Sequence, residues 1–461
     1  MNTTTSEVVV NPPQSAAVTF RLARILRLAT FQIGSTLGDI LVTSIWNRIM
    51  INELGMNATP VGLLIALRYL LAPLSLWAGY WSDTRPWFGF HRTPYIWAGR
   101  LLIVLSYPLL PLSLTYFAAD KGDVTGWLIA IVCFLMYGTG TLLSGGNLLA
   151  LVRDSVPQQR RGFAISIMET FLIIMFPIAA ISLGRAMRDF SLDAFWSVTL
   201  TVMGISAFFW FFAVVGIEKR FSNPRSENDQ STPKFGESIR KIWKDADTRG
   251  FFVFLAIATL AAWAQDAILE PFGAQVLGQD VEQTTRYSAY WQTATVLFLI
   301  GCVIRFRRRP PEANVRLTKI GLGIMALGMA TLAVAAFGAQ LRMLQLALVI
   351  FGAGFGIYTF GGFSLLVAMT SDAEAGMYLG LWTICVLLSR GVGIALGGIL
   401  RDVFLALTSS PTTTYGLIFL LEAIGLVAAI FALTRVDVIG FGKRVGRIAS
   451  EADAAGIEIG P

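Results

Sequence analysis

Histidine and cysteine are scarce in this chain of 461 residues. The sequence has one histidine, His91, and three cysteines that all fall within apolar stretches, Cys133, Cys302 and Cys385. A single imidazole and separated thiols exclude zinc sites made of clustered histidines and cysteines, and they argue against disulfides. The chain also lacks a phosphate-binding glycine loop and a hydrolase nucleophile elbow. We therefore expect no enzyme active site and no bound metal, and we expect His91 to be a helix-boundary residue.

Charge is scarce as well. Charged residues make up 14% of the chain and hydrophobic residues 55%, whereas about a quarter of a soluble domain is charged. No soluble core could bury so much apolar surface, so the composition predicts a polytopic protein of the lipid bilayer. The formal net charge of +7 comes from lysines and arginines that gather in the two tails and in every second link between apolar stretches. This distribution is typical of the cytoplasmic side of a membrane protein, and it argues against nucleic acid as a partner.

Twelve apolar stretches of membrane-spanning length follow one another. We expect spans near residues 29–51, 60–82, 95–117, 126–152, 163–184, 194–217, 250–272, 286–305, 317–337, 342–369, 378–400 and 414–434. Pro108 and Pro111 should kink the third span. The polar stretch between the sixth and seventh spans has little apolar periodicity, which is typical of a linker. We therefore divide the chain into a cytoplasmic tail (1–28), a six-helix bundle (29–217), a cytoplasmic linker (218–249), a second six-helix bundle (250–434) and a cytoplasmic tail (435–461).

The two halves show a weak internal repeat. Asp39 in the first span has a counterpart in Asp266 in the seventh. A glycine pair at 145–146, near the end of the fourth span, matches the pair at 361–362 in the tenth. Many transporters are built from repeats of this kind, related by an axis along the membrane normal. The sequence thus predicts an all-α polytopic membrane protein with 12 transmembrane helices in two six-helix bundles and both termini in the cytoplasm.

The link between the second and third spans carries Gly79, Asp83, Arg85, Gly89 and Arg92. Glycine suits a sharp turn at the water boundary. The aspartate can sit where a helix ends, and the arginines can donate to it or to helix-end carbonyls. This spacing resembles the signature loop between helices 2 and 3 of the major facilitator superfamily, and the resemblance implies the major facilitator fold. The alternative interpretation is an ordinary positively charged cytoplasmic loop.

Polar residues also lie inside the first and seventh spans, where a charge is costly unless it faces protein or water. Asp39 and Asn47 are eight residues apart, so they lie near one face of the first helix. Asp266 and Glu270 are four apart and share a face of the seventh, with Pro271 directly after to end or bend it. We interpret these two clusters as a candidate polar path or binding site along the bundle interface, formed by Asp39, Asn47, Arg48, Gln265, Asp266 and Glu270.

The alternative is that ionisable residues in the spans form ion pairs that hold the bundles together. Three residues are the main candidates for such structural pairs: Arg68, Glu169 and Arg390. Arg390 stands alone in the apolar middle of the eleventh span and needs a partner, and Asp266 is the expected one.

Four stretches are similar to one known family. Residues 265–273 look like the helix 7 signature of the PucC/LhaA family, also called the bacteriochlorophyll delivery family, and residues 38–42, 47–54 and 92–97 agree with it. Phe272 stands where that signature has tyrosine. The resemblance implies a bacterial protein of the inner photosynthetic membrane, intracytoplasmic or thylakoid, that assists the assembly of light-harvesting antenna complexes. The partners that it implies are antenna polypeptides and chlorophyll or its biosynthesis and synthase machinery.

The cofactor that this resemblance implies is (bacterio)chlorophyll. Since the spans contain no histidine, its magnesium would need an oxygen ligand from Asn47, Gln265, Glu270, a backbone carbonyl or water. The alternative function is proton-coupled secondary transport of an amphipathic or tetrapyrrole-like solute, with Asp39, Asp266 or Glu270 as the proton carrier. A purely structural subunit is less favoured, because polar groups lie deep in the spans.

Overall fold

The computed structural model describes residues 22–157, 160–218, 243–306, 314–369 and 375–444. Within these ranges twelve helices are long and apolar enough to cross a membrane, which confirms the predicted number of spans. The expected linker over 218–249 is described at Glu218 and from Trp243 onward, and its remainder lies outside the described residues.

The first six spans are built from the following elements: α1 (Leu22–Ala29), α2 (Phe31–Ile40), the π-helical η1 (Leu41–Trp46) and η2 (Ile49–Glu53), α3 (Ala58–Leu70), α4 (Pro73–Thr84), α5 (Thr93–Ser106), α6 (Leu109–Ala119), α7 (Val124–Ser155), α8 (Arg161–Ala186) and α9 (Leu192–Val214). The second six are built from α11 (Ala246–Trp263), the 3₁₀ turn η5 (Ala264–Ala267), α12 (Leu269–Leu277), α13 (Val281–Phe306), α14 (Val315–Phe337), α15 (Leu341–Ala368), α16 (Ala375–Thr408) and α17 (Pro411–Thr434), and α18 (Val438–Arg444) follows.

Local sequence explains where several helices begin and break. The carboxylate of Asp123 accepts the backbone N–H of Thr125 at 2.6 Å and so caps α7, as short polar side chains commonly do. The second span is divided at Pro73, which begins α4. The kink predicted at Pro108 is also present, because α5 ends at Ser106 and α6 begins directly after the proline.

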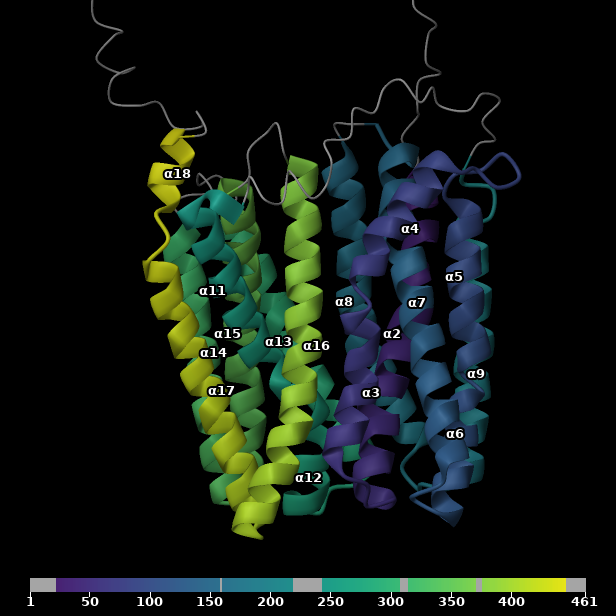
Figure 1. Cartoon of the computed structure of the whole chain (residues 1–461), viewed down its shortest axis with the longest axis vertical. Helices are drawn as coiled ribbons and strands as arrows, with labels where there is room; N and C mark the ends of the chain where they lie inside the picture. Colours follow the sequence, from purple (N-terminus) through teal and green to yellow (C-terminus); the bar gives the residue numbers. More distant parts are fainter. Residues whose placement is uncertain (1–21, 158–159, 219–242, 307–313, 370–374, 445–461) are drawn as a thin grey trace, which may run out of the picture.

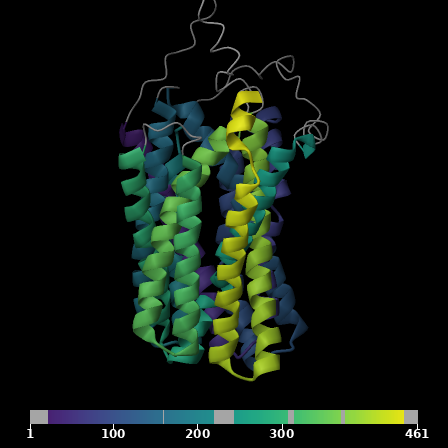
Figure 2. The same ribbon diagram turned by 90° about the vertical axis from the view of Figure 1, so that its left-hand side faces the viewer.

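The two halves of the chain stand side by side as separate bundles, the purple-to-blue half beside the green-to-yellow half (Figure 1). In the view turned by 90° the green-to-yellow half stands in front of the other (Figure 2). Helix α3 packs on α16 and α8 packs on α13 across the interface. Glycines allow the first approach: a Cβ on Gly398 would lie 2.5 Å from the carbonyl oxygen of Ala58, and one on Gly391 would lie 2.9 Å from Cβ of Tyr69. Small residues are the usual means of close helix packing in lipid.

The two ends of the molecule differ. One end carries the start of α1, the link between α4 and α5, and α18, and we call it the terminal face (top of Figure 1). The other end carries α12, and we call it the distal face. Large apolar side chains such as Leu297 and Phe431 stay exposed between the two faces, at 64% and 66% of their surface, as lipid contact requires.

The α4–α5 link corrects one expectation. Gly79 lies inside helix α4, where a Cβ would meet no neighbouring atom within 4 Å, so it does not make the turn. Gly89 does, with a φ of 80°. Asp83 lies in the last turn of α4, and its side chain is outside the described part. Arg85 stacks on its own helix, with its guanidinium carbon 4.8 Å from the ring centroid of Trp81.

Arg92 is the buried anchor of this link. Its Nη1 donates to Ser82 at 2.5 Å and to Asn147 at 3.3 Å, and its Nε lies 3.6 Å from a carboxylate oxygen of Asp154. Arg92 therefore joins α4 and α5 to α7. The carboxylate of Glu218, at the end of the sixth span, accepts the backbone N–H groups at the start of α5 at 2.7 to 3.2 Å.

Candidate functional site

The first span of each bundle loses its α-helical form where the predicted polar residues lie. Helix α2 ends one residue after Asp39 and gives way to η1 and η2. Helix α11 gives way to η5, and Pro271 falls in the first turn of α12 just beyond the break. Irregular backbone at membrane depth is tolerated only where protein or a water-filled cavity surrounds it, and π-helical turns are frequent at functional sites. The repeat thus places an irregular segment in each bundle.

Two ion pairs lie in the middle of the spans. Arg68 Nη1 of α3 is 2.7 Å from Oδ1 of Asp39. Arg390 Nη2 of α16 is 3.3 Å from Oδ2 of Asp266. The second pair is the one that the sequence predicted, and the first gives Arg68 its partner within the N-terminal bundle. Pairing is needed at this depth, because an unpaired charge would be strongly destabilising.

Aromatic rings join these two pairs across the interface. Arg68 donates a hydrogen bond to the hydroxyl of Tyr69. The guanidinium carbon of Arg390 lies 4.6 Å from the ring centroid of Tyr69 and 3.5 Å from that of Trp263, in the range of cation–π contacts. The result is one connected group of side chains from both bundles, which we call the central cluster: Asp39, Arg68, Tyr69, Trp263, Asp266 and Arg390.

A second group of polar residues lies between the central cluster and the distal face. Asn47 Nδ2 donates to the carbonyl of Ala267 at 2.9 Å, and Arg48 Nη2 donates to the carbonyl of Gln279 at 2.9 Å. Glu270, in the first turn of α12, is buried beside them at 4% exposure. These contacts bind the irregular part of the first span to that of the seventh.

Further polar contacts close the distal end of the interface. The carboxylate of Asp402 on α16 accepts the backbone N–H groups of Ala58 and Thr59 at 3.0 and 2.7 Å, so it caps α3 from the other bundle. Glu282 on α13 lies 3.3 Å from Arg188, just past the end of α8. These contacts separate the central cluster from the distal face. Residues 381–390 of α16, which run from the cluster toward the terminal face, are only half-buried.

The structural ion pair expected for Glu169 is not among those that the described residues form, and it stays a prediction. Glu169 on α8 is exposed. Gln265 is buried at 3% exposure beside the central cluster, and its proposed contact role stays a prediction.

Sequence reasoning missed several residues of the interface. Tyr69 and Trp263 resemble ordinary apolar residues of a span, and Asp402 stands near a helix end, where a charge needs no special explanation. Arg100 was missed too: it is 6% exposed, and its guanidinium carbon lies 4.3 and 4.6 Å from the ring centroids of Phe31 and Trp210. A buried arginine in the third span was the available signal for it.

Comparison with known proteins places the chain in a family. The family model described as PUCC protein matches residues 45–441. The chain belongs to the PucC family. Protein PucC of Rhodovulum sulfidophilum is 29% identical over 404 residues, which are 84% of this chain and 87% of that protein. The bacteriochlorophyll synthase 44.5 kDa chain of Rhodobacter capsulatus is 27% identical over 424 residues, which are 90% of this chain and 95% of that protein.

Solved structures confirm the fold class. The crystal structure of a D-xylose-proton symporter superposes with a TM-score of 0.64 at 15% identity, covering 88% of this chain and 97% of that one. The crystal structure of the nucleoside transporter NupG superposes with a TM-score of 0.62, also at 15% identity, covering 90% of this chain and 99% of that one. The two-bundle arrangement of twelve spans is therefore the transporter-like major facilitator fold. At this identity the likeness concerns the fold alone, because one fold hosts many functions.

Proposed function

We propose that this PucC-family protein assists the assembly of light-harvesting antenna complexes by holding (bacterio)chlorophyll, antenna polypeptides or both. The family match over residues 45–441 carries the proposal. The name of the Rhodobacter capsulatus relative, a bacteriochlorophyll synthase chain, supports a place beside the pigment machinery. The proposal assigns no catalytic centre to the chain. It places the protein in the photosynthetic membrane with its terminal face in the cytoplasm.

The central cluster supports a ligand that is mostly apolar. Its two carboxylates are each paired with an arginine, so the cluster offers no uncompensated charge to a strongly ionic solute. Tyr69 and Trp263 add aromatic faces against the guanidinium of Arg390. Flat rings with one cation beside them suit a large planar molecule that has few polar groups.

The oxygen donors near the cluster fit a pigment magnesium. Oδ1 of Asn47 is buried and has no hydrogen-bond partner among the described atoms, and magnesium prefers oxygen ligands. Asn47 is thus the first candidate to hold the metal, with Glu270 and Gln265 as the alternatives. A bound (bacterio)chlorophyll would supply the light-absorbing macrocycle, while the chain's residues would orient it and exclude water.

The test uses a photosynthetic bacterium that lacks its own antenna-assembly protein of this family. Expression of the chain should restore antenna absorbance per cell, and the chain purified in mild detergent should carry (bacterio)chlorophyll absorbance. An absorbance no higher than in the empty host, at confirmed expression, would rule out the assembly role. If expression of the chain restores the antenna in the cell but the purified chain carries no pigment, the chain acts on the antenna polypeptides alone.

Proton-coupled transport is the second candidate, because Glu270 is a carboxylate buried within the seventh span, and an ionisable side chain at that depth is a candidate proton carrier. Glu270 separates the two functions. Glu270→Gln keeps a carbonyl oxygen for ligation but cannot carry a proton, whereas Glu270→Leu removes both properties. Under the assembly proposal with Glu270 as the ligand, the glutamine variant retains a large part of the antenna absorbance and the leucine variant loses it. With Asn47 as the ligand, both variants retain it. Equal loss in both variants at matched expression would favour transport.

A further inference from the structure

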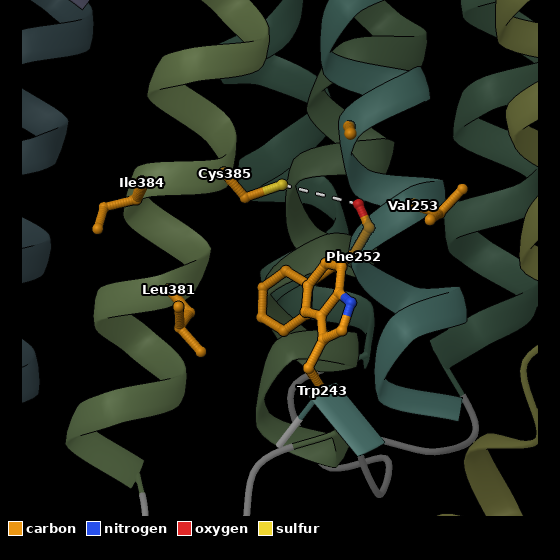
Figure 3. A pocket seen from close by; sticks show the side chains of 7 residues that line it. Trp243, Phe252, Val253, Leu381, Ile384 and Cys385 are labelled. Carbon is orange, nitrogen blue, oxygen red and sulfur yellow. Dashed lines mark hydrogen bonds between the residues drawn. The ribbon is translucent and has the colours of Figure 1, made fainter. Parts of the chain in front are cut away.

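A groove at the terminal-face end of the second bundle is separate from the central cluster. It lies between α11 and α16, has a volume of about 260 Å³, and is lined by Trp243, Phe252, Val253, Ala256, Leu381, Ile384 and Cys385. In Figure 3 the Trp243 ring lies between the two helices, with Leu381 and Cys385 on one wall and Phe252 on the other. An apolar cavity of about 150 Å³ holds a benzene molecule, so this groove has room for a longer hydrocarbon.

Trp243 covers the groove without closing it. Its ring stacks on Phe252, with centroids 6.2 Å apart and an angle of 27° between the planes, yet the residue is 48% exposed. Tryptophan is enriched where the headgroups of a bilayer meet its hydrocarbon. The side chain therefore sits at the height where a lipid tail would enter the groove and its headgroup would stay outside.

Charges of both signs lie beside the groove, and the two cations among them are exposed. Lys244 follows Trp243, and Arg249 lies one helical turn before Val253 on the same face of α11. Both are exposed, and neither takes part in an ion pair among the described residues. The two neighbouring carboxylates keep their charge and are held by backbone N–H groups: Asp245 accepts the N–H of Thr248 at 2.8 Å, and Asp247 accepts the N–H of Asp437 at 3.0 Å.

We propose that this groove binds one acyl chain of an anionic phospholipid from the leaflet at the terminal face, with the phosphate beside Lys244 and Arg249. The apolar lining selects the hydrocarbon and the two cations select the charge of the headgroup. A lipid bound in this site contacts both Trp243, which precedes the seventh span, and the eleventh span. It is independent of whether the central cluster holds a pigment.

The test measures lipid retention by the purified full chain, using native mass spectrometry with added phosphatidylglycerol or phosphatidylcholine. One phosphatidylglycerol should remain bound. Lys244→Gln and Arg249→Gln should each lower the affinity of the chain for phosphatidylglycerol about five-fold, which is the effect of removing one basic residue near an anionic membrane surface. Ala256→Phe, which fills the groove, should abolish retention. The matched controls are Arg316→Gln, an exposed cation of α14, and Ala330→Phe, a half-buried alanine of α14.

Cys385 provides a second measurement at the groove itself. Its thiol lies 3.7 Å from the carbonyl of Phe252 inside the lining, so a bound acyl chain should slow its alkylation by N-ethylmaleimide. Phosphatidylglycerol should protect Cys385 and phosphatidylcholine should not. Equal retention of the two lipids, no effect of Ala256→Phe, or protection by chlorophyll but not by phosphatidylglycerol would each overturn the proposal.

Discussion

The guanidinium of Arg390, in the C-terminal bundle, lies over the ring of Tyr69, in the N-terminal bundle, at 4.6 Å from its centroid. This contact connects the Asp266–Arg390 pair to the Asp39–Arg68 pair, since Tyr69 also accepts a hydrogen bond from Arg68. The two ion pairs of the repeat are therefore one structural unit across the interface. A ligand that separates the bundles here must break this contact.

Tyr69 variants test this connection. Tyr69→Phe keeps the ring and should retain most of the stability, whereas Tyr69→Leu should lose the cation–π contact, about 1 kcal/mol. The measurement is the thermal unfolding midpoint in detergent, with Tyr116→Leu, a partly exposed tyrosine of α6, as the control. Identical midpoints for the leucine and phenylalanine variants would show that the ring contact contributes nothing.

The Asp266–Arg390 pair makes a second prediction. Asp266→Asn or Arg390→Gln alone leaves a charge without its partner in the membrane interior, which costs about 3–5 kcal/mol. Each single variant should therefore be less abundant in the membrane than the parent protein. The double variant removes both charges and should recover part of the loss. A double variant no more abundant than the worse single variant would contradict the pairing.

Asp402 should control closure of the distal end. Asp402→Ala removes the cap that α16 provides to the start of α3. By analogy with helix N-caps, this should lower the free energy of unfolding by about 1 kcal/mol. The two bundles should then separate more often at the distal face. A cysteine placed at Thr59 should react faster with a membrane-impermeant maleimide in the Asp402→Ala background than in the parent. An unchanged rate would show that the cap does not hold the interface.

Orientation in the membrane is a further prediction, because basic residues mark the terminal face as cytoplasmic. Single cysteines at Asp120, on the α6–α7 link, and at Arg342, in the first turn of α15, are placed at exposed positions and should be labelled from outside the cell. A cysteine at Arg85, exposed on the α4–α5 link, should be labelled only after the membrane is opened. Labelling of all three from one side would contradict the topology.

Local sequence was enough to identify the twelve spans and the family. Lipid accepts only long apolar helices with satisfied backbones, so length and composition identify the spans directly. The family rests on local stretches such as residues 265–273, which can be compared without any structure. The partner of Arg390 was also predictable, because a lone arginine in an apolar span must be paired and few carboxylates stand at its depth.

How the two bundles meet could not be predicted in this way. Helical periodicity gives the face on which a residue lies, but it does not say which helix covers that face. Asp402 reaches the start of α3 across 344 positions of sequence, and Tyr69 meets Arg390 because glycine at 391 lets the helices approach. These contacts depend on packing between segments that are distant in the sequence, and local sequence patterns do not predict that packing.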